Sequence, residues 1–258
     1  MEHRAARNPA RPASPAGVGT VEKAVDVLQY LHDAGAPRGV TAIGRGLGLP
    51  KATAHRLLQT LGRRGLVDRD DAGRYRPGIA LVALGLGVIE REPVVAAARP
   101  VVEAEAERLG ETIFLAGARA GRLFVLDKCE GSAFLRAAPR VGAEVPLHAT
   151  AVGKLYLALA AEQVDLEESP AAYTGLTLVG EALDRDLART RERGWAENRE
   201  EWIAGLVGLA APVYSRGRLA ACIAASGAAA RTEVWGPDAI GHLMRAAREI
   251  GATLEGTK

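Results

Sequence analysis

The sequence predicts an α+β protein with an N-terminal winged helix-turn-helix and a second, larger domain. Three observations support this fold class. Helical periodicity dominates residues 20–64, a hairpin pattern follows at 66–76, and strand-like segments alternate with helical ones beyond Gly110. The chain has 258 residues, which favours two ordinary domains. We expect a disordered tail at 1–18, a winged helix-turn-helix domain at 19–80, linker helices at 81–109 and the second domain at 110–258.

The charge distribution favours a nucleic-acid module at the front of the chain. Residues 1–90 hold 13 Lys and Arg against 8 Asp and Glu, whereas residues 91–258 hold 20 against 23. No apolar run is long enough to predict a membrane-spanning helix. The two cysteines, Cys129 and Cys222, are far apart, so we expect neither a disulfide scaffold nor a zinc site and place the protein in the cytoplasm.

Three helices are predicted in the first domain. Thr20 is the expected N-cap of a helix over 21–33, in which apolar residues recur at helical spacing. Thr41 is the expected cap of a short helix over 42–47, and a Gly-containing turn leads into a helix over 51–64. This succession, followed by a hairpin, is the pattern of a winged helix-turn-helix.

The helix over 51–64 is the predicted DNA-recognition helix. Its apolar residues form one stripe, and its opposite face carries polar and basic side chains that can donate to base edges in a major groove. The alternative is a merely solvated face, which the three-helix context with its hairpin disfavours. We expect base contacts from Arg56 and Gln59, with His55 and Ala52 near the helix start; further predicted DNA contacts are Thr41, Lys51, Thr53, Thr60, Arg63 and the wing residues Arg69, Arg74 and Arg76.

Beyond the hairpin, the sequence predicts two connecting helices and then mixed structure. The helices at 79–92 and 93–109 have an excess of apolar residues, which suggests contact with a partner. No internal repeat is visible. Predicted strands are 112–118, 122–128, 133–136, 206–214 and 219–226, and predicted helices are 150–161, 181–194 and 237–254.

The segment 142–154 ends in Gly153-Lys154, which resembles a phosphate loop. The phosphate-loop pattern requires a glycine where His148 stands, so nucleotide hydrolysis is not expected. A helix starting near Thr150 would instead present free backbone N–H groups to an anion, and a carboxylate ligand could dock there beside His148. The alternative is an ordinary helix start without a ligand.

No catalytic constellation emerges from the remaining polar residues. Glu200 and Glu201 are adjacent, and adjacent strand residues point to opposite faces, so one inward glutamate in a pocket or a solvated strand end are the two interpretations. Ser226 lacks a nucleophile-elbow sequence, and Cys222 lies in an apolar strand typical of an inert buried thiol. We expect no enzyme activity, no cofactor and no metal.

Several short motifs in a fixed order resemble the IclR family of bacterial regulators across residues 20–254. They include Leu49–Leu58, Tyr75 before Pro77-Gly78, Gly110-Glu111-Thr112, Pro146–Lys154, Glu200-Glu201 with Gly205, Ala211-Pro212-Val213 and Ser226-Gly227. The resemblance implies a winged helix-turn-helix, a linker helix and a GAF/PAS-like effector-binding domain with an antiparallel sheet. It also implies double-stranded operator DNA as a partner, a small organic or aromatic acid as effector, and a homo-oligomer that is a dimer or a dimer of dimers.

The resemblance further implies an effector pocket on one face of the sheet, beneath the loop before Gly153. Some family members carry a polar residue where Ala224 stands, so this wall is more apolar here. Two alternatives remain open: an enzyme whose second domain does chemistry, and a DNA-binding structural protein without a ligand. The implied pocket residues are Leu147, His148, Ala149, Thr150, Ala151, Glu201, Gly208, Cys222, Ala224 and Ser226.

Overall fold

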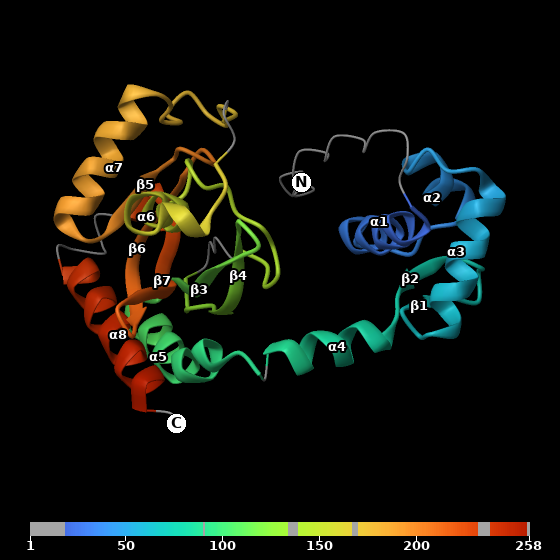
Figure 1. Cartoon of the computed structure of the whole chain (residues 1–258), viewed down its shortest axis with the longest axis horizontal. Coiled ribbons are helices and arrows are strands. Elements are labelled where there is room, and N and C mark those ends of the chain that lie inside the picture. The colour runs from blue at the N-terminus through green and yellow to red at the C-terminus, as the bar shows by residue number, and fades with distance from the viewer. Residues whose placement is uncertain (1–18, 90, 134–138, 167–169, 232–237, 257–258) are drawn as a thin grey trace. The chain divides into compact units, whose positions relative to one another are not determined.

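The computed structural model describes residues 19–89, 91–133, 139–166, 170–231 and 238–256 (Figure 1). The chain divides into two compact units, residues 1–88 and 89–258, and the division falls near the end of helix α4. The predicted strand at 133–136 lies almost entirely outside the described residues. No helix in the described ranges is both long enough and apolar enough to cross a membrane.

The described part of the first unit contains three helices, a two-stranded hairpin and most of a fourth helix. Its elements are α1 (Thr20–Asp33), α2 (Val40–Gly46), α3 (Lys51–Arg63), β1 (Val67–Arg69), β2 (Tyr75–Pro77) and most of α4 (Ile79–Ile89). The apolar stripes of the helices meet the hairpin in one small core, formed by Val27, Leu31, Ile43, Leu57, Leu58, Leu61, Val67 and Tyr75. Strands β1 and β2 pair antiparallel, which confirms the predicted hairpin.

Both predicted helix caps in this unit are wrong. Gly19, not Thr20, caps α1, and its backbone N–H donates to Glu22 Oε2 at 2.8 Å. Gly39, not Thr41, caps α2. The early start of α2 has a tertiary cause, because Arg38 exchanges two backbone hydrogen bonds with Tyr75 and so fixes the chain just before the helix.

The second unit is built on a five-stranded antiparallel sheet in the order β4-β3-β7-β6-β5. The strands are β3 (Thr112–Arg119), β4 (Arg122–Cys129), β5 (Ala196–Arg199), β6 (Leu206–Ser215) and β7 (Arg218–Ala228). Four of them were predicted, and β5 was not. The α+β prediction is confirmed, including an antiparallel sheet flanked by helices.

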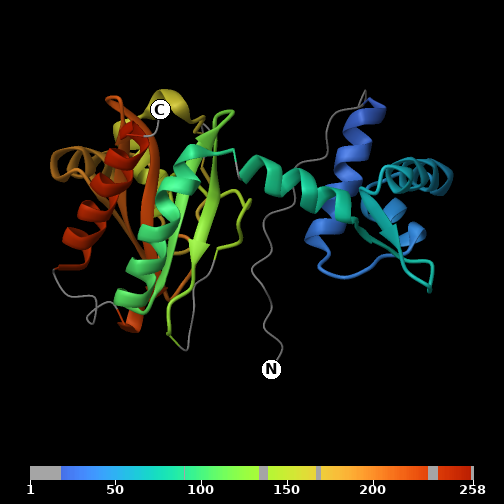
Figure 2. The same ribbon diagram turned by 90° about the horizontal axis from the view of Figure 1, so that it is seen from below.

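Alternation along the strands divides the core between the two faces of this sheet. One face is covered by α5 (Pro93–Leu109) and α8 (Asp238–Gly256), which lie side by side in Figure 2. Ile113, Leu115 and Ile223 point to that face. Phe114, Ala116 and Ala224 point to the other, where α6 (Ala151–Leu159) packs on the sheet and α7 (Glu181–Arg193) packs on α6. A single 3-10 turn, Ala161–Gln163, follows α6.

Candidate functional site

The outer face of α3 is the candidate DNA surface. Arg56, Gln59 and Arg63 are exposed at positions i, i+3 and i+7, on the side opposite the buried leucines. Of the other predicted DNA residues, Thr53 is half-buried, whereas Thr41, Lys51, Ala52, His55, Thr60, Arg69, Arg74 and Arg76 are exposed.

Close packing places α3 against α2. Gly44 leaves no room for a side chain, because a Cβ there would lie 2.9 Å from the Leu49 carbonyl oxygen and 3.8 Å from the Ala54 Cβ. Gly44 therefore lets α2 pack closely on the turn and on Ala54 of α3. Because the apolar stripe of α3 is buried, its polar side chains point outward.

Two wing arginines have partners within the hairpin. Arg74 Nε pairs with Asp70 Oδ2 at 2.9 Å, and the Arg69 guanidinium lies 5.7 Å from the centre of the Tyr75 ring. The backbone N–H of Arg74 and then its guanidinium lower the pKa of Asp70. The wing tip is therefore a closed, charge-paired turn, and Arg76 is its exposed basic residue on β2.

A second candidate site is a cavity of about 340 Å³ on the α6 side of the sheet. Its floor follows the strand register: Asn198 is paired with Gly208, and Gly208 with Ser226. In the next row, Ala224 is paired with Phe114. The first turn of α6 and the segment 202–207 form further walls, and Pro139 and Val145 also line the cavity.

The cavity wall is mostly apolar. Polar side chains on it are Thr150, Asn198 and Ser226, and none of the described residues that line it carries a charged side chain. A ligand here would therefore be held by apolar contact and by a few directed hydrogen bonds, which is typical of small-molecule sites.

Helix α6 begins at the edge of this cavity, as the sequence predicts. Thr150 is its N-cap, and Thr150 Oγ1 accepts the Gly153 N–H at 3.0 Å while donating to the Pro146 carbonyl at 2.6 Å. A Cβ at Gly153 would lie 2.1 Å from the Leu147 carbonyl oxygen, so only glycine allows the loop to fold back on the helix. The Gly153-Lys154 pair thus serves a tight helix entry.

Half of the predicted pocket residues line the cavity. These are Thr150, Ala151, Gly208, Ala224 and Ser226. The predicted residues that do not line it are Leu147, His148, Ala149, Glu201 and Cys222.

The imidazole of His148 lies in the loop that precedes α6, away from the cavity lining. Its Nε2 bonds to the Ala171 carbonyl at 2.8 Å, and its ring stacks on Tyr173 with 5.5 Å between centroids. The Ala149 carbonyl accepts a hydrogen bond from Asn198 Nδ2. These contacts tie the loop to its neighbours rather than directing His148 toward a ligand.

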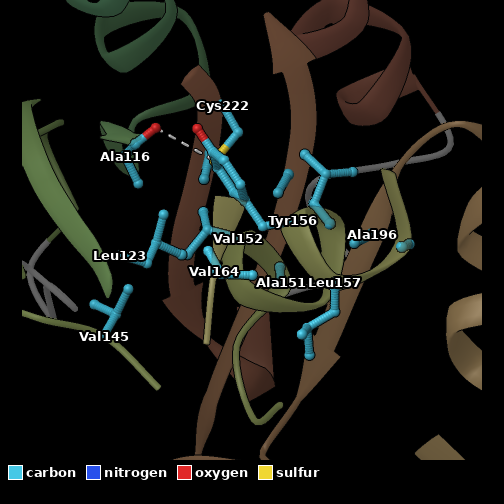
Figure 3. Close-up of a cluster of buried hydrophobic side chains, with 14 of the residues drawn as sticks. Ala116, Leu123, Val145, Ala151, Val152, Tyr156, Leu157, Val164, Ala196 and Cys222 are labelled. Atoms are coloured by element: carbon cyan, nitrogen blue, oxygen red, sulfur yellow. Dashed lines mark hydrogen bonds between the residues drawn. The ribbon is translucent and has the colours of Figure 1, made fainter. Parts of the chain in front are cut away.

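Cys222 is fully buried beside Tyr156, as Figure 3 shows. Its thiol donates to the Ala116 carbonyl, with 3.6 Å between sulfur and oxygen. Burial raises the pKa of the thiol, which keeps it protonated. Cys222 is therefore a core residue, which agrees with the interpretation of an inert buried thiol.

Glu201 is buried, but its carboxylate faces Lys154 instead of the cavity. The two glutamates follow β5 and do not lie in a strand, and Glu200 has a φ of 60° with Oε2 accepting the Gly205 N–H at 2.7 Å. The interpretation of Glu201 as an exposed strand end is wrong.

Sequence reasoning did not identify several lining residues. Phe114 and Asn198 reach the cavity through strand register, and Trp202 and Ile203 through the loop between β5 and β6. In β5, buried Ala196 and Asn198 alternate with the less buried Glu197 and Arg199. This alternation covers only four residues, which is too short to predict a strand.

Comparison with known proteins matches both units. Residues 20–71 match the family described as "IclR helix-turn-helix domain", and residues 86–252 match "Bacterial transcriptional regulator IclR C-terminal". The HTH-type transcriptional regulator XynR of Escherichia coli (strain K12) is 34% identical over 206 residues, covering 77% of this chain and 81% of XynR. The HTH-type transcriptional repressor AllR of the same organism is 29% identical over 253 residues, covering 95% and 93%.

A solved structure has the same fold. An IclR homolog from Microbacterium hydrocarbonoxydans, crystallised in complex with 4-hydroxybenzoate, superposes with a TM-score of 0.79 at 24% identity, covering 93% of this chain and all of that one (100%). The two family matches together span most of the described residues, and they assign the chain to a family. This chain belongs to the IclR family of bacterial transcriptional regulators, with a DNA-binding helix-turn-helix and a C-terminal effector domain, and it is not an enzyme.

Proposed function

We propose that the chain binds an operator through α3 and that a small organic acid in the 340 Å³ cavity changes the affinity for that operator. Arg56 and Gln59 would contact base edges, because both are exposed on the outer face of α3. Lys51, Arg63 and Arg76 would contact phosphates and fix the register.

The cavity is the observation that carries the ligand proposal. Its volume lies near the lower end of the range for ligand pockets, roughly 300–1,000 Å³, so one ring or a short chain fits. Phe114, Trp202 and Ile203 supply apolar contact for such a body. Thr150, Asn198 and Ser226 stand at the wall with the first turn of α6, where a carboxylate could accept backbone N–H donors.

The complex of the Microbacterium homolog with 4-hydroxybenzoate supports an aromatic acid as the ligand class. An aromatic acid fits this wall because its ring would lie on apolar residues and its carboxylate would require only neutral donors. A much larger metabolite would exceed the volume of the cavity. A dicationic metabolite would find no carboxylate among the described lining residues to pair with.

We also propose that the working unit is a homo-oligomer that contains a dimer formed through α4. This helix, IALVALGLGVI, has no charged residue and no buried residue within the chain. Ile79, Leu84 and Val88 are each more than 60% exposed. A second copy of the same helix would remove this apolar surface from water, and two α3 helices would then match the two half-sites of an operator.

Thermal unfolding of the full chain tests the ligand proposal. The panel contains benzoate, 4-hydroxybenzoate and short aliphatic acids, with benzyl alcohol as the neutral control for the ring. A ligand that binds only the folded state raises the melting temperature as its concentration rises. We expect a rise with at least one acid and none with benzyl alcohol; no rise with any acid would favour a DNA-binding protein that needs no ligand.

A further inference from the structure

A buried lysine lies one turn beyond the part of α6 that lines the cavity. Lys154 is 1% exposed, and its Nζ lies 2.7 Å from Glu201 Oε1 and 2.8 Å from Asp186 Oδ2. The two carboxylates are buried as well and come from different places, α7 and the loop after β5. Lys154 is not among the residues that line the cavity.

The surroundings of Lys154 explain why its ammonium group pairs with buried carboxylates. Every residue of α6 except Leu159 is buried, so an ammonium group on this helix has to find its partners inside the protein. Asp186 has a second partner, Arg189 Nη2 at 3.0 Å, whose side chain reaches solvent. Glu201 Oε1 also accepts the Arg199 backbone N–H at 3.3 Å, and Oε2 has no hydrogen-bond partner in the described part of the chain. Among the described side chains, Lys154 supplies the positive charge next to this carboxylate.

Glu201 directly precedes the segment 202–208, which forms a wall of the cavity. Trp202 and the residues up to Gly208 line the cavity, and the loop closes on itself through the Glu200 N–H, which donates to the Leu206 carbonyl at 2.8 Å. On the other side, Thr177 Oγ1 donates to the Glu201 carbonyl at 2.6 Å. The position of Glu201 therefore sets where this wall lies.

A hydrogen bond also ties the loop before α6 to β5. Asn198 Nδ2 donates to the Ala149 carbonyl. Within the wall, Trp202 packs against the apolar cluster that contains most of α6, so this side of the wall has apolar contact as well. Lys154 is the only charged residue of α6, and its ion pair with Glu201 joins the helix to the loop that follows β5.

We propose that Lys154 is a positioning residue of the cavity: the buried hydrogen bond that its ammonium group donates to Glu201 fixes the Trp202–Gly208 wall against α6. The proposal rests on the proposed function in one respect, because the cavity is taken as the effector site. A side chain that does not line the cavity would then decide whether the ligand meets a formed wall.

The test uses the ligand-free full chain, so it does not depend on knowing the effector. The chain has three tryptophans, and a W195F/W235F background leaves Trp202, on the wall, as the one emitting residue. Two readouts are made: acrylamide quenching of Trp202, and hydrogen exchange of the peptide over 199–208 compared with that of α8.

The decisive variants are E201A and E201Q. E201A removes the acceptor and leaves the neutral Lys154–Asp186 pair, whereas E201Q keeps a side-chain carbonyl that accepts from Nζ. We expect E201A to raise quenching about two-fold and to speed exchange at 199–208 roughly ten-fold, with α8 unchanged and E201Q close to wild type.

K154M provides the second comparison. K128M is its control, because Lys128 on β4 forms a partly exposed ion pair with Glu130. K154M should loosen the 199–208 peptide as E201A does, and K128M should not. If K154M does not fold, the comparison of E201A with E201Q still tests the proposal through the same two measurements. Unchanged quenching and exchange in E201A, equal loosening of α8, or an E201Q as loose as E201A would each overturn the proposal.

Discussion

Asn198 on β5 and Ser226 on β7 lie in one row across the sheet, separated by Gly208 on β6. Because Gly208 has no side chain, the two polar groups border a shared hollow, and all three residues line the cavity. The next row brings Phe114 beside Ala224. The floor of the proposed effector site is therefore a product of strand register.

Ala224→Val tests whether this floor binds the ligand. The two added methyl groups project into the cavity, so we expect the acid-induced rise in melting temperature to fall by at least half. The measurement is the thermal shift of the full chain at several ligand concentrations. Ala116→Val is the matched control, because Ala116 is equally buried on the same face and does not line the cavity. Equal loss in both variants would show that overpacking, not occupancy, is the cause.

Thr150→Val tests the helix start at the cavity edge. The variant keeps the volume and removes the hydroxyl that accepts the Gly153 N–H and donates to the Pro146 carbonyl. Loss of an N-cap costs about 1 kcal/mol, so we expect a reduction of that order in the free energy of unfolding, measured by urea titration. Thr150→Ser should retain most of the stability. Equal stability of the two variants would contradict the assigned cap.

Arg56 and Arg63 should respond differently to substitution. If Arg56 contacts a base, Arg56→Ala costs about 1–3 kcal/mol of operator binding and relaxes the preference at one position. Arg63→Ala should weaken binding similarly on all sequences and reduce the slope of log K against log salt by about one. Fluorescence anisotropy on a duplex selected from a random pool, repeated at several salt concentrations, separates them. A uniform loss for Arg56→Ala would assign it to the phosphate backbone.

Leu84→Glu tests the proposed dimer contact. Leu84 is 63% exposed on α4, so the substitution should hardly change the fold but would bury a charge in a dimer. Sedimentation velocity should show a shift toward monomer. Leu176→Glu is the control, because Leu176 is also exposed but lies outside α4. If Leu84→Glu sediments as wild type does, α4 is not the interface.

Glu201→Gln tests how the ionisation of Glu201 changes protein stability with pH. Burial raises the pKa of Glu201 above its ordinary value of 4.5, so the folded state holds this proton more tightly than the unfolded state. The contribution of Glu201 to stability is therefore present below about pH 4.5 and is lost as the pH rises through the folded pKa. Glutamine does not titrate. Melting temperatures measured from pH 4 to pH 8 should show Glu201→Gln gaining on wild type as the pH rises, then a constant difference; a constant difference throughout would contradict the raised pKa.

The sequence predicted elements whose signals are local and missed those that depend on distant partners. The stripe of α3, the hairpin and the start of α6 at Thr150 follow from residues close together in the chain. The caps of α1 and α2 were misplaced, in the second case because Arg38 pairs with Tyr75 across the domain. A backbone hydrogen bond between residues so far apart leaves no pattern in the sequence around either residue.

The candidate site shows the same division. Thr150 and Ala151 are found by the helix-start motif, whereas Phe114 and Asn198 enter through the pairing of strands far apart in sequence. Glu201 was expected in the pocket, yet its partner Lys154 lies 47 residues earlier in the chain. A buried ion pair between such positions is visible only once the fold brings α6 and the β5–β6 loop together.

The most direct test of the central claim is operator affinity with and without the acid found by thermal shift. The dissociation constant of the full chain for the selected duplex is measured by anisotropy at saturating ligand. We predict a change of about five-fold or more, retained in Ala116→Val and lost in Ala224→Val. A ligand that binds the cavity while the dissociation constant stays the same would contradict the claim that this site regulates DNA binding.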